Sequence, residues 1–334
     1  MSTRQVQAFL CAAAALGALA APWLFPSVLT QLAFLWLMVV FALTWDVMGG
    51  QTGYNSFGNI LFFGIGAYVC AVVQRDLVSG YLSGFAAGIA LAGIAAALVG
   101  MLLGPALLAL RGHYFAIATL GLGVAAADLA AGWRTIGAAS GMITPQFPGL
   151  IENRARFFYY LLLALAALTL VTLRRVYDGH FGLAINAIRD DEEKAEAMGL
   201  NTGRYKVLAW CIAAFFLGLA GAVAGNLVGY IDPRELAFAG STYGVWMVLM
   251  AILGGRGTLW GPVLGACLFH VTQELFWTFL LGWQRVAMGI FILVIVMYFP
   301  AGVAGWLQQR MSQRTVGAPA PFGGQGVGAK DAQQ

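Results

Sequence analysis

Long runs of apolar residues, separated by short polar segments, dominate the pattern of this chain. Ten runs can be drawn: Ala8–Phe25, Val28–Val47, Phe57–Val73, Leu82–Leu110, Tyr114–Trp133, Phe157–Leu173, Val207–Tyr230, Ser241–Leu253, Pro262–Leu281 and Val286–Trp306. An α-helix needs roughly 20 mainly apolar residues to cross a bilayer. Leu82–Leu110 is long for one span and contains Pro105, whereas Ser241–Leu253 is short enough to be a broken helix. The pattern predicts an all-α, polytopic membrane bundle of about ten transmembrane helices.

The two ends of the chain need separate interpretations. Arg4 precedes the first apolar run, and Ala18–Ala21 resembles a signal-peptide cleavage site. Because this run is long and another span follows directly, we predict an uncleaved first helix. After Trp306 the chain becomes polar and rich in Gly, Pro and Ala. We therefore predict a membrane domain over residues 1–306 and a disordered cytoplasmic tail over residues 307–334.

The composition supports a membrane protein. Hydrophobic residues make up 60% of the 334 positions and charged residues 10%, with a mean hydropathy of +0.81. A soluble domain carries roughly 25% charged residues, so the apolar excess here must face lipid. The 44 glycines suit closely packed membrane helices. The four cysteines lie in apolar stretches without a CxxC pair, so we predict neither a metal site nor a disulfide framework.

One loop, residues 174–206, holds six of the eighteen basic residues and six of the fourteen acidic ones. Basic residues concentrate on the cytoplasmic side of membranes, so we place this loop there. Counting helices outward puts both termini in the cytoplasm. Arg134, Arg154, Arg156 and Arg234 then fall on the outer side, so the rule is obeyed only in part.

A short amphipathic helix is expected inside this loop, over Gly182–Leu200. Its apolar stripe is predicted to consist of Leu183, Ala187, Ala195 and Met198. Gly199 is predicted to end the helix, and Asn201–Gly203 to form the turn that follows. A simple connector needs only a handful of residues, which favours a docking surface over a solvated hairpin. A helix lying on the membrane is a third interpretation, but anionic lipid would repel six acids.

Five segments in the right order carry a resemblance to a known family. They are GLAINAIRDDEEKAEAMG at 182–199, AAFFLGLAGA at 213–222, GGRGTLWGPVLGA at 254–266, FFGIGAY at 62–68 and GHYFAIATLG at 112–121. Together they resemble ABC-importer permeases of the branched-chain amino acid type. The match covers most of the chain between Gly49 and Pro300.

The resemblance implies a transport subunit of a bacterial inner membrane rather than an enzyme. Such a permease pairs with a second, homologous permease and sits on two cytoplasmic P-loop ATPases. An extracytoplasmic solute-binding protein delivers the substrate. The chain lacks a GxxxxGK[ST] phosphate loop, so we expect it to bind no cofactor itself and its partner subunits to use the ATP. Membrane lipid is an expected partner, and nucleic acid is not.

The resemblance also assigns the loop at 174–206 the role of coupling ATPase closure to the helix bundle. The positions that match the family's coupling-loop pattern are Gly182, Ala187, Arg189, Asp191, Glu196, Ala197 and Gly199. Leu183 and Asn186 depart from it, because the family often has basic residues there.

A second unusual segment, Gly49–Asn59, is polar and glycine-dense between two apolar spans. Irregular backbone at membrane depth survives only if it is buried or lines a wet cavity. We therefore place in the translocation path Gln51, Thr52, Tyr54, Asn55, Ser56 and Asn59, together with the intramembrane acids Asp128 and Glu274. The alternatives are an ordinary cytoplasmic turn for the segment and structural pairing for each acid.

The predicted function is the import of a small polar solute, most simply a branched-chain or related amino acid. Residues 138–144 match the family poorly, so urea or amides, aromatic acids and sugars stay open as substrates. A self-sufficient secondary transporter is an alternative, although it would need no docking loop. An intramembrane enzyme is disfavoured, because the sequence has no HExxH, no GxSxG and only three histidines.

Overall fold

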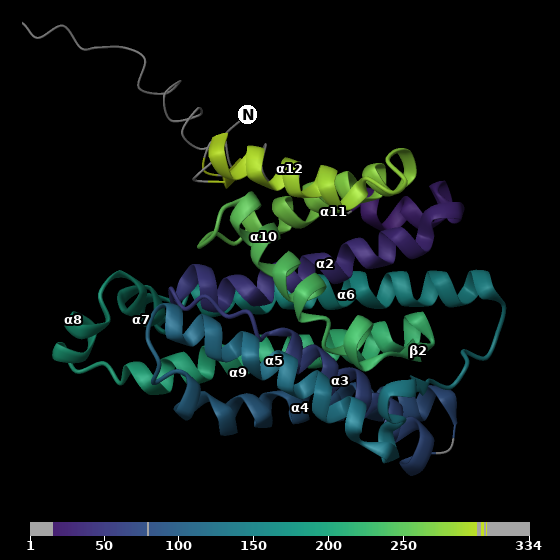
Figure 1. The fold of residues 1–334 in the computed structure, drawn as a ribbon, viewed down its shortest axis with the longest axis horizontal. Coiled ribbons are helices and arrows are strands. Elements are labelled where there is room, and N and C mark those ends of the chain that lie inside the picture. The colour runs from purple at the N-terminus through teal and green to yellow at the C-terminus, as the bar shows by residue number, and fades with distance from the viewer. Residues whose placement is uncertain (1–15, 79, 299–301, 304, 306–334) are drawn as a thin grey trace, which may run out of the picture.

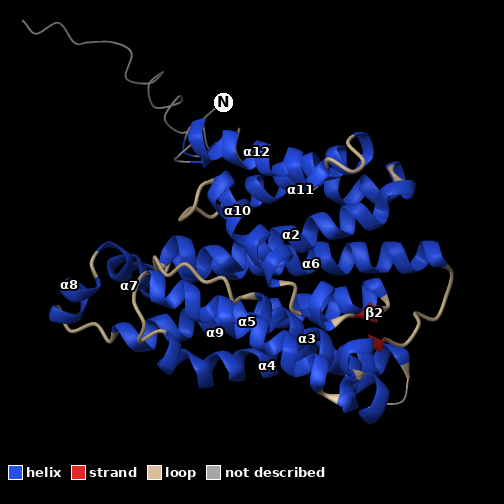
Figure 2. Cartoon of the chain, in the orientation of Figure 1, coloured by secondary structure: helices blue, strands red, loops and turns tan. Residues whose placement is uncertain are grey.

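The structure is a computed structural model that describes residues 16–78, 80–298, 302–303 and 305. Most of this part of the chain is helical (Figure 2). The elements are α2 (Leu29–Asp46), α3 (Ile60–Val72), α4 (Tyr81–Leu107), α5 (His113–Gly132), β1 (Met142–Ile143), α6 (Ile151–Tyr177), α7 (His180–Asp190), α8 (Glu192–Ala197), α9 (Thr202–Val228), β2 (Tyr230–Ile231), α10 (Val245–Gly254), α11 (Gly261–Phe279) and α12 (Gln284–Tyr298). The predicted all-α bundle is confirmed.

Seven helical segments in the described part are long and apolar enough to cross a membrane. They are Pro26–Gln51, Ile60–Leu77, Tyr81–Leu107, His113–Gly132, Asn153–Tyr177, Thr202–Val228 and Pro233–Gly254. Each overlaps one of the ten predicted runs. The predicted runs Ala8–Phe25 and Val286–Trp306 lie partly outside the described residues, and α11 is made less apolar by His270, Gln273 and Glu274.

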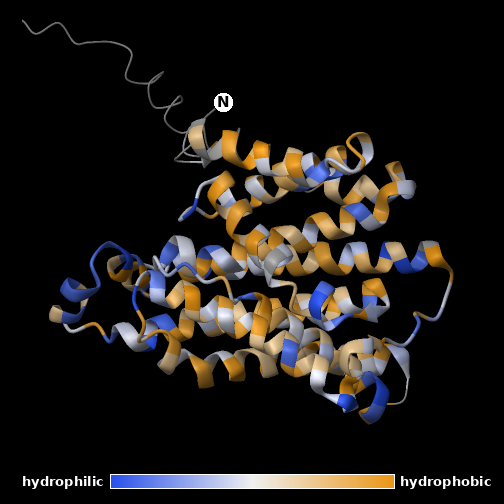
Figure 3. Cartoon of the chain, in the orientation of Figure 1, coloured by the Kyte–Doolittle hydropathy of each residue, from blue (hydrophilic) through white to orange (hydrophobic). Residues whose placement is uncertain are grey.

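The long helices run side by side along the longest axis of the molecule (Figure 1). α7 and α8 lie at one end of this axis, and the β1–β2 pair, with Met142 opposite Ile231, lies towards the other. Hydrophilic residues gather around α7 and α8, whereas the helices between the two ends are mostly hydrophobic (Figure 3). This is the distribution expected when the middle of the bundle faces lipid and its ends face water.

α9 is the most deeply buried of the seven spans, and small residues allow its neighbours to approach it. A Cβ atom added at Gly221 would lie 1.9 Å from the carbonyl oxygen of Phe63 in α3. One added at Gly218 would lie 2.6 Å from the carbonyl oxygen of Ala92 in α4. Only glycine fits at such backbone contacts, which explains part of the high glycine content.

Residues 16–24, ahead of α2, are helical and pack against α6. The Tyr159 hydroxyl donates a hydrogen bond to the Ala18 carbonyl oxygen at 2.6 Å, and the Tyr160 hydroxyl donates one to Leu19 at 3.1 Å. The predicted first helix is therefore present where the structure describes it. The predicted disordered tail, residues 307–334, lies outside the described residues.

Two of the spans are interrupted rather than regular. α2 continues into a π-helical turn, Val47–Gln51, and the chain is then irregular up to Asn59. The second interrupted span consists of two π-helical turns, Pro233–Ala237 and Gly240–Gly244, followed by α10. The prediction of a broken helix around Ser241–Leu253 is confirmed, although the span is longer than predicted because it begins at Pro233.

Candidate functional site

The loop at 174–206 contains two helices, so the prediction of one helix over Gly182–Leu200 is wrong. α7 ends at Asp190 and α8 begins at Glu192, and Asp191 between them has an extended backbone (φ −162°, ψ 103°). The Asp191 carboxylate accepts a hydrogen bond from the backbone N–H of Lys194 at 3.1 Å. An aspartate in this role caps the start of a helix, so it restarts the helix here instead of continuing α7.

The predicted apolar stripe of this loop is also displaced. The residues that pack inward are Gly182, Ala184, Ile185, Ile188 and Ala195. Of the predicted stripe, only Ala195 is buried, whereas Leu183 and Met198 are 68% and 86% exposed and Ala187 is also exposed. Within α7 the buried face is the one that carries Ile185 and Ile188, not the one that carries Leu183 and Ala187, and the break at Asp191 ends the helical register before α8. Apolar Leu183 and Met198 are left on the outward surface.

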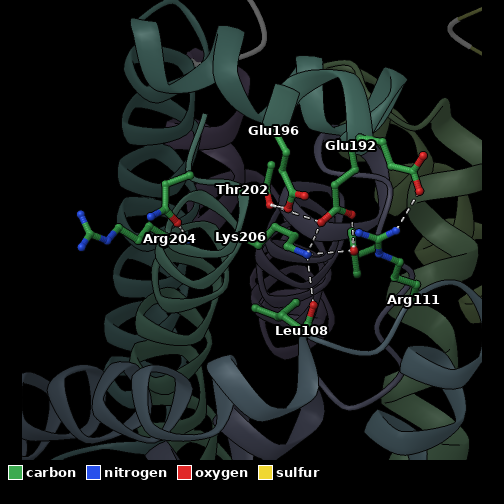
Figure 4. Close-up of polar contacts among 10 residues, drawn as sticks. Leu108, Arg111, Glu192, Glu196, Thr202, Arg204 and Lys206 are labelled. Carbon is green, nitrogen blue, oxygen red and sulfur yellow. Dashed lines mark hydrogen bonds and ion pairs between the residues drawn. The ribbon is translucent and has the colours of Figure 1, made fainter. Parts of the chain in front are cut away.

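A buried cluster of polar side chains joins α8 to the rest of the bundle (Figure 4). At its centre the Lys206 ammonium lies 2.6 Å from the Glu192 carboxylate, and their side chains are only 5% and 14% exposed. Lys206 also donates hydrogen bonds to the Tyr54 hydroxyl at 2.9 Å and to the Leu108 carbonyl oxygen at 3.1 Å. All three donors of the ammonium group are thus satisfied.

Tyr54 completes the cluster from the irregular segment that follows α2. Its hydroxyl donates a hydrogen bond to the second carboxylate oxygen of Glu192 at 2.5 Å. The Lys206 nitrogen lies 4.6 Å from the centroid of the Tyr54 ring, within the range of a cation–π contact. The cluster therefore connects four segments: α8, the start of α9, the end of α4 and the segment after α2.

The electrostatics of the cluster keep Glu192 ionised. Burial raises the pKa of the Glu192 carboxyl, but the hydrogen bonds from Lys206 and Tyr54 and the nearby positive charges outweigh it and lower the pKa overall. Burial, followed by the hydrogen bond to Glu192, raises the pKa of Tyr54 well above its usual range, so this hydroxyl stays protonated. A charged acceptor with two charged or strong donors makes a short, strong set of hydrogen bonds.

Two further contacts fix α8 beside this cluster. The Thr202 hydroxyl donates a hydrogen bond to the Glu196 carboxylate at 2.5 Å, which ties the end of α8 to the start of α9. Arg111, after α4, forms an ion pair with Glu193 at 3.2 Å. The Arg111–Glu193 pair is exposed to solvent, and such pairs contribute little stability.

Arg189, in α7, reaches the two glycine-rich turns of the interrupted spans. Its guanidinium donates a hydrogen bond to the Gly50 carbonyl oxygen at 3.4 Å. A Cβ atom at Gly257 would lie 3.4 Å from the same guanidinium. The buried Asp46 carboxylate accepts a hydrogen bond from the Gly257 N–H at 2.8 Å, so the two turns meet directly. Both interrupted spans therefore end against α7.

The seven predicted coupling-loop residues fall into three groups: glycines at tight backbone positions, side chains that form polar contacts, and exposed alanines. Gly182 lies so close to Tyr177 that a Cβ would meet its carbonyl oxygen at 2.1 Å, and Gly199 has the φ of +91° expected where α8 ends. Asp191, Arg189 and Glu196 make the contacts described above. Ala187 and Ala197 are exposed. The structure brings all seven together at one end of the bundle, and their coupling role stays a prediction.

Five of the six polar residues predicted at 51–59 are buried: Gln51, Thr52, Tyr54, Ser56 and Asn59. Asn55 is exposed. Asn59 accepts a hydrogen bond from the Trp210 indole at 3.3 Å. Among the described residues, the Ser56 hydroxyl and the Asn59 amide nitrogen are buried without a hydrogen-bond partner. Such groups need water or a solute to satisfy them, so Ser56 and Asn59 are better path candidates than Tyr54.

The two intramembrane acids differ in their surroundings. Asp128 accepts a hydrogen bond from Arg234 at 3.0 Å, and both side chains are more than half exposed near the β1–β2 end. Glu274 lines an open cavity of about 320 Å³ between α2 and α11, together with Gln31 and Gln273. Asp128 thus has a structural partner, which is the alternative to a path role, while Glu274 lines a cavity together with two glutamines and the aromatic Phe34 and Trp277. Both path roles stay predictions.

Comparison with known proteins decides the family. Residues 27–299 match the model of the family described as the branched-chain amino acid transport system, permease component. The chain belongs to this family. The permease is therefore a multi-pass membrane protein, which agrees with the seven segments of the described part that are long and apolar enough to cross a membrane. The resemblance drawn from the five motifs is confirmed.

Several relatives are similar to this permease. The high-affinity branched-chain amino acid transport system permease protein LivM of Escherichia coli K12 is 28% identical over 294 residues, covering 80% of this chain and 67% of LivM. The probable LivM of Methanocaldococcus jannaschii is 25% identical over 289 residues, covering 80% and 78%. The LivH permease protein of Escherichia coli K12 is 26% identical over 144 residues, covering 43% and 44%. No solved structure matches the permease.

The sequence alone does not reveal the most buried ion pair of the described residues, Lys206 with Glu192. In the sequence, both residues are simply members of the charged loop at 174–206. One signal could have found Lys206: it stands at the start of a long apolar span, where an ionisable group needs a partner. Nothing local points to Tyr54 as that partner, because it is 152 residues away in the sequence.

We expect replacement of Asn59 by leucine to weaken transport, and replacement of Asn55 to weaken it less. Asn59→Leu removes the acceptor of the Trp210 indole and the unpaired amide from the predicted path, and an unsatisfied buried donor costs about 1–3 kcal/mol. Initial uptake rates over a range of substrate concentrations, corrected for the amount of permease in the membrane, measure this. Unchanged kinetics in both variants would show that the segment is only a turn.

Proposed function

We propose that this permease is one of two membrane subunits of an ATP-driven importer, and that it carries a branched-chain or related amino acid into the cytoplasm. The end of the bundle formed by α7 and α8 faces the cytoplasm in this proposal, with both chain termini on the same side. Two P-loop ATPase subunits dock on α7 and α8, and an extracytoplasmic binding protein delivers substrate at the opposite end.

The buried cluster of Tyr54, Glu192 and Lys206 is the observation that carries the proposal. A loop that only joined two spans would not need a desolvated ion pair tying its second helix to the interrupted part of the bundle. Arg189 adds a second link to the same interrupted span, at the Gly50 carbonyl oxygen, and the hydrogen bond between Asp46 and Gly257 joins that span to the turn after the other one. A movement of α7 and α8 caused by a docked ATPase would therefore be transmitted to both interrupted spans, as a transporter driven by a separate subunit requires.

The relatives support a second, different permease as partner. Escherichia coli K12 has both a LivM and a LivH permease protein whose names assign them to a high-affinity branched-chain amino acid transport system. This chain is similar to LivM over 294 residues and to LivH over only 144 residues. We propose that it takes the LivM-like place and pairs with a LivH-like chain. The same names favour leucine, isoleucine or valine over urea, amides, aromatic acids and sugars.

Uptake into proteoliposomes tests the proposal. The permease is reconstituted with the subunits that co-purify with it, and labelled leucine is offered with the binding protein outside and ATP inside. We expect accumulation that requires ATP and is reduced by excess isoleucine or valine but not by urea or ribose. Accumulation by this chain alone, driven by an ion gradient, would support the secondary transporter instead. Competition by urea, an aromatic acid or ribose alone would move the substrate to that class.

A further inference from the structure

A groove opens beside the buried cluster, between the end of α4 and the start of α9. It encloses about 670 Å³, and its wall is mainly apolar, with Met101, Pro105, Val207 and Leu208 among the lining residues. Met101 and Leu208 are 54% and 47% exposed, as expected of side chains on the outer surface of a membrane bundle. The groove thus lies where the hydrocarbon core meets the polar end of the molecule that carries α7 and α8.

Arg204 lines this groove, and in the described part of the chain no acidic side chain pairs with its guanidinium. Within the part of the chain described, its guanidinium makes no ion pair or hydrogen bond, and only its backbone N–H is bonded, to the Asn201 side chain. Figure 4 shows the Arg204 side chain pointing away from the buried cluster. The other lining charges already have partners. Lys206 pairs with Glu192, Arg111 with Glu193, and Glu196 accepts from Thr202.

The apolar wall continues from Arg204 along one face of α9. Leu208, Cys211 and Phe215 follow Arg204 at spacings of four, three and four residues, which places all four on one side of the helix. A second cavity, of about 420 Å³ between α6 and α9, is lined by these last three residues and shares Leu208 with the first. From Arg204 to Phe215 the helix rises about 16 Å, close to one leaflet of a hydrocarbon core roughly 30 Å thick.

We infer that this groove binds an anionic glycerophospholipid of the leaflet on the α7–α8 side. Its phosphate contacts the Arg204 guanidinium, and one acyl chain lies on Leu208, Cys211 and Phe215. Of the three cations in the lining, Arg111 is paired with Glu193 and Lys206 with Glu192, which leaves the Arg204 guanidinium to contact a headgroup, while Glu196 is hydrogen-bonded to Thr202. Basic pockets between membrane helices recognise anionic headgroups in this way. The site depends on the membrane placement of the permease but not on the importer mechanism.

Thermal unfolding of the full chain in an uncharged detergent, with phosphatidylglycerol added stepwise, tests this inference. We expect a saturable rise in the unfolding temperature. Arg204→Gln should need about fivefold more phosphatidylglycerol for half of the effect, because one arginine near an anionic headgroup contributes about that factor. Arg175→Gln is the matched control, since Arg175 is also exposed at this end of the bundle but lies outside the groove. It should respond like the unchanged protein.

Two further comparisons separate the lipid from other sources of the effect. An equal rise with phosphatidylcholine, or with inorganic phosphate alone, would overturn the inference. An equal rise with phosphatidylcholine would show that binding does not need the negative charge of the headgroup. An equal rise with inorganic phosphate would show that binding does not need the acyl chain. Leu208→Asn places an amide on the apolar wall and should weaken the response, whereas Leu102→Asn, at a 77% exposed position outside the groove, should not. Equal responses from Arg204→Gln and Arg175→Gln would also contradict it.

Discussion

Deleting Asp190–Met198 should abolish substrate uptake while leaving the permease in the membrane. The deletion removes α8 and with it Glu192, Glu193 and Glu196, so the loop loses its contact with Tyr54 and keeps only the Arg189 hydrogen bond to the interrupted span. The spanning helices are apolar and packed on one another independently of α8, which is why we expect the protein to stay inserted. Uptake assays and membrane fractionation of the same cells measure both effects.

A single substitution tests the same role of the loop without the risk that the deletion misfolds the permease. Met198 is 86% exposed, so Met198→Asp should leave the fold intact and still disrupt an apolar docking contact with an ATPase. Asp178→Ala is the control, because Asp178 is also exposed at this end and its contact with Arg174 is a long surface pair of 3.8 Å. Unchanged uptake in the deletion would contradict the coupling role of the loop. Unchanged uptake in Met198→Asp would exclude Met198 from the docking surface.

Lys206→Met should destabilise the permease by about 3 kcal/mol and reduce uptake at least in proportion. It leaves the Glu192 carboxylate without its cation, and breaking a buried ion pair typically costs 3–5 kcal/mol. We expect the lower end of that range, since the Glu192 side chain keeps 14% of its surface exposed. The unfolding temperature in detergent and the uptake rate per molecule in the membrane measure the two consequences.

The neighbouring Lys194 provides a matched control for this variant. Its side chain is 82% exposed and pairs with Asp191 at 2.8 Å, and a surface pair of this kind contributes at most about 1 kcal/mol. Lys194→Met should therefore change stability little. The double variant Lys206→Met with Glu192→Gln should recover much of the lost stability, because no uncompensated charge then remains buried. Equal effects of Lys206→Met and Lys194→Met would show that the buried cluster has no special role.

The sequence predicts the spans well because each needs only a local run of apolar residues. α2 and α4 begin and end within three residues of the predicted bounds, whereas α9 begins at Thr202, five residues before the predicted Val207. The broken character of the span containing α10 follows from its short apolar run. The break at Asp191 was missed because a helix pattern and an acidic run both continue across it. Only the capping bond to Lys194 decides between one helix and two.

The site was predictable only in outline. The loop at 174–206 stands out by its charge, and the segment at 49–59 by its glycine and polar residues, so both could be singled out separately. Their contact could not be predicted, because Tyr54 and Glu192 are 138 residues apart and no periodic pattern links them. The same limit applies to Asp46 and Gly257, whose hydrogen bond brings together two glycine-rich turns 211 residues apart.

The cluster also suggests how the interrupted spans are used. Tyr54 and Arg189 touch the end of one interrupted span, and the turn at Gly257 continues from the other. Irregular backbone ends have fewer internal hydrogen bonds to break than a regular helix, so they move at lower cost. A loop that holds both ends is well placed to move them together.

The most direct test of the central claim is a gentle-detergent purification of the tagged permease, with the co-purifying chains identified by mass spectrometry. The account predicts a second, homologous permease and P-loop ATPase subunits in the same complex, and their loss on deletion of Asp190–Met198. Recovery of the chain alone or only as a homo-oligomer, without an ATPase in several mild detergents, would contradict it and favour a self-sufficient secondary transporter.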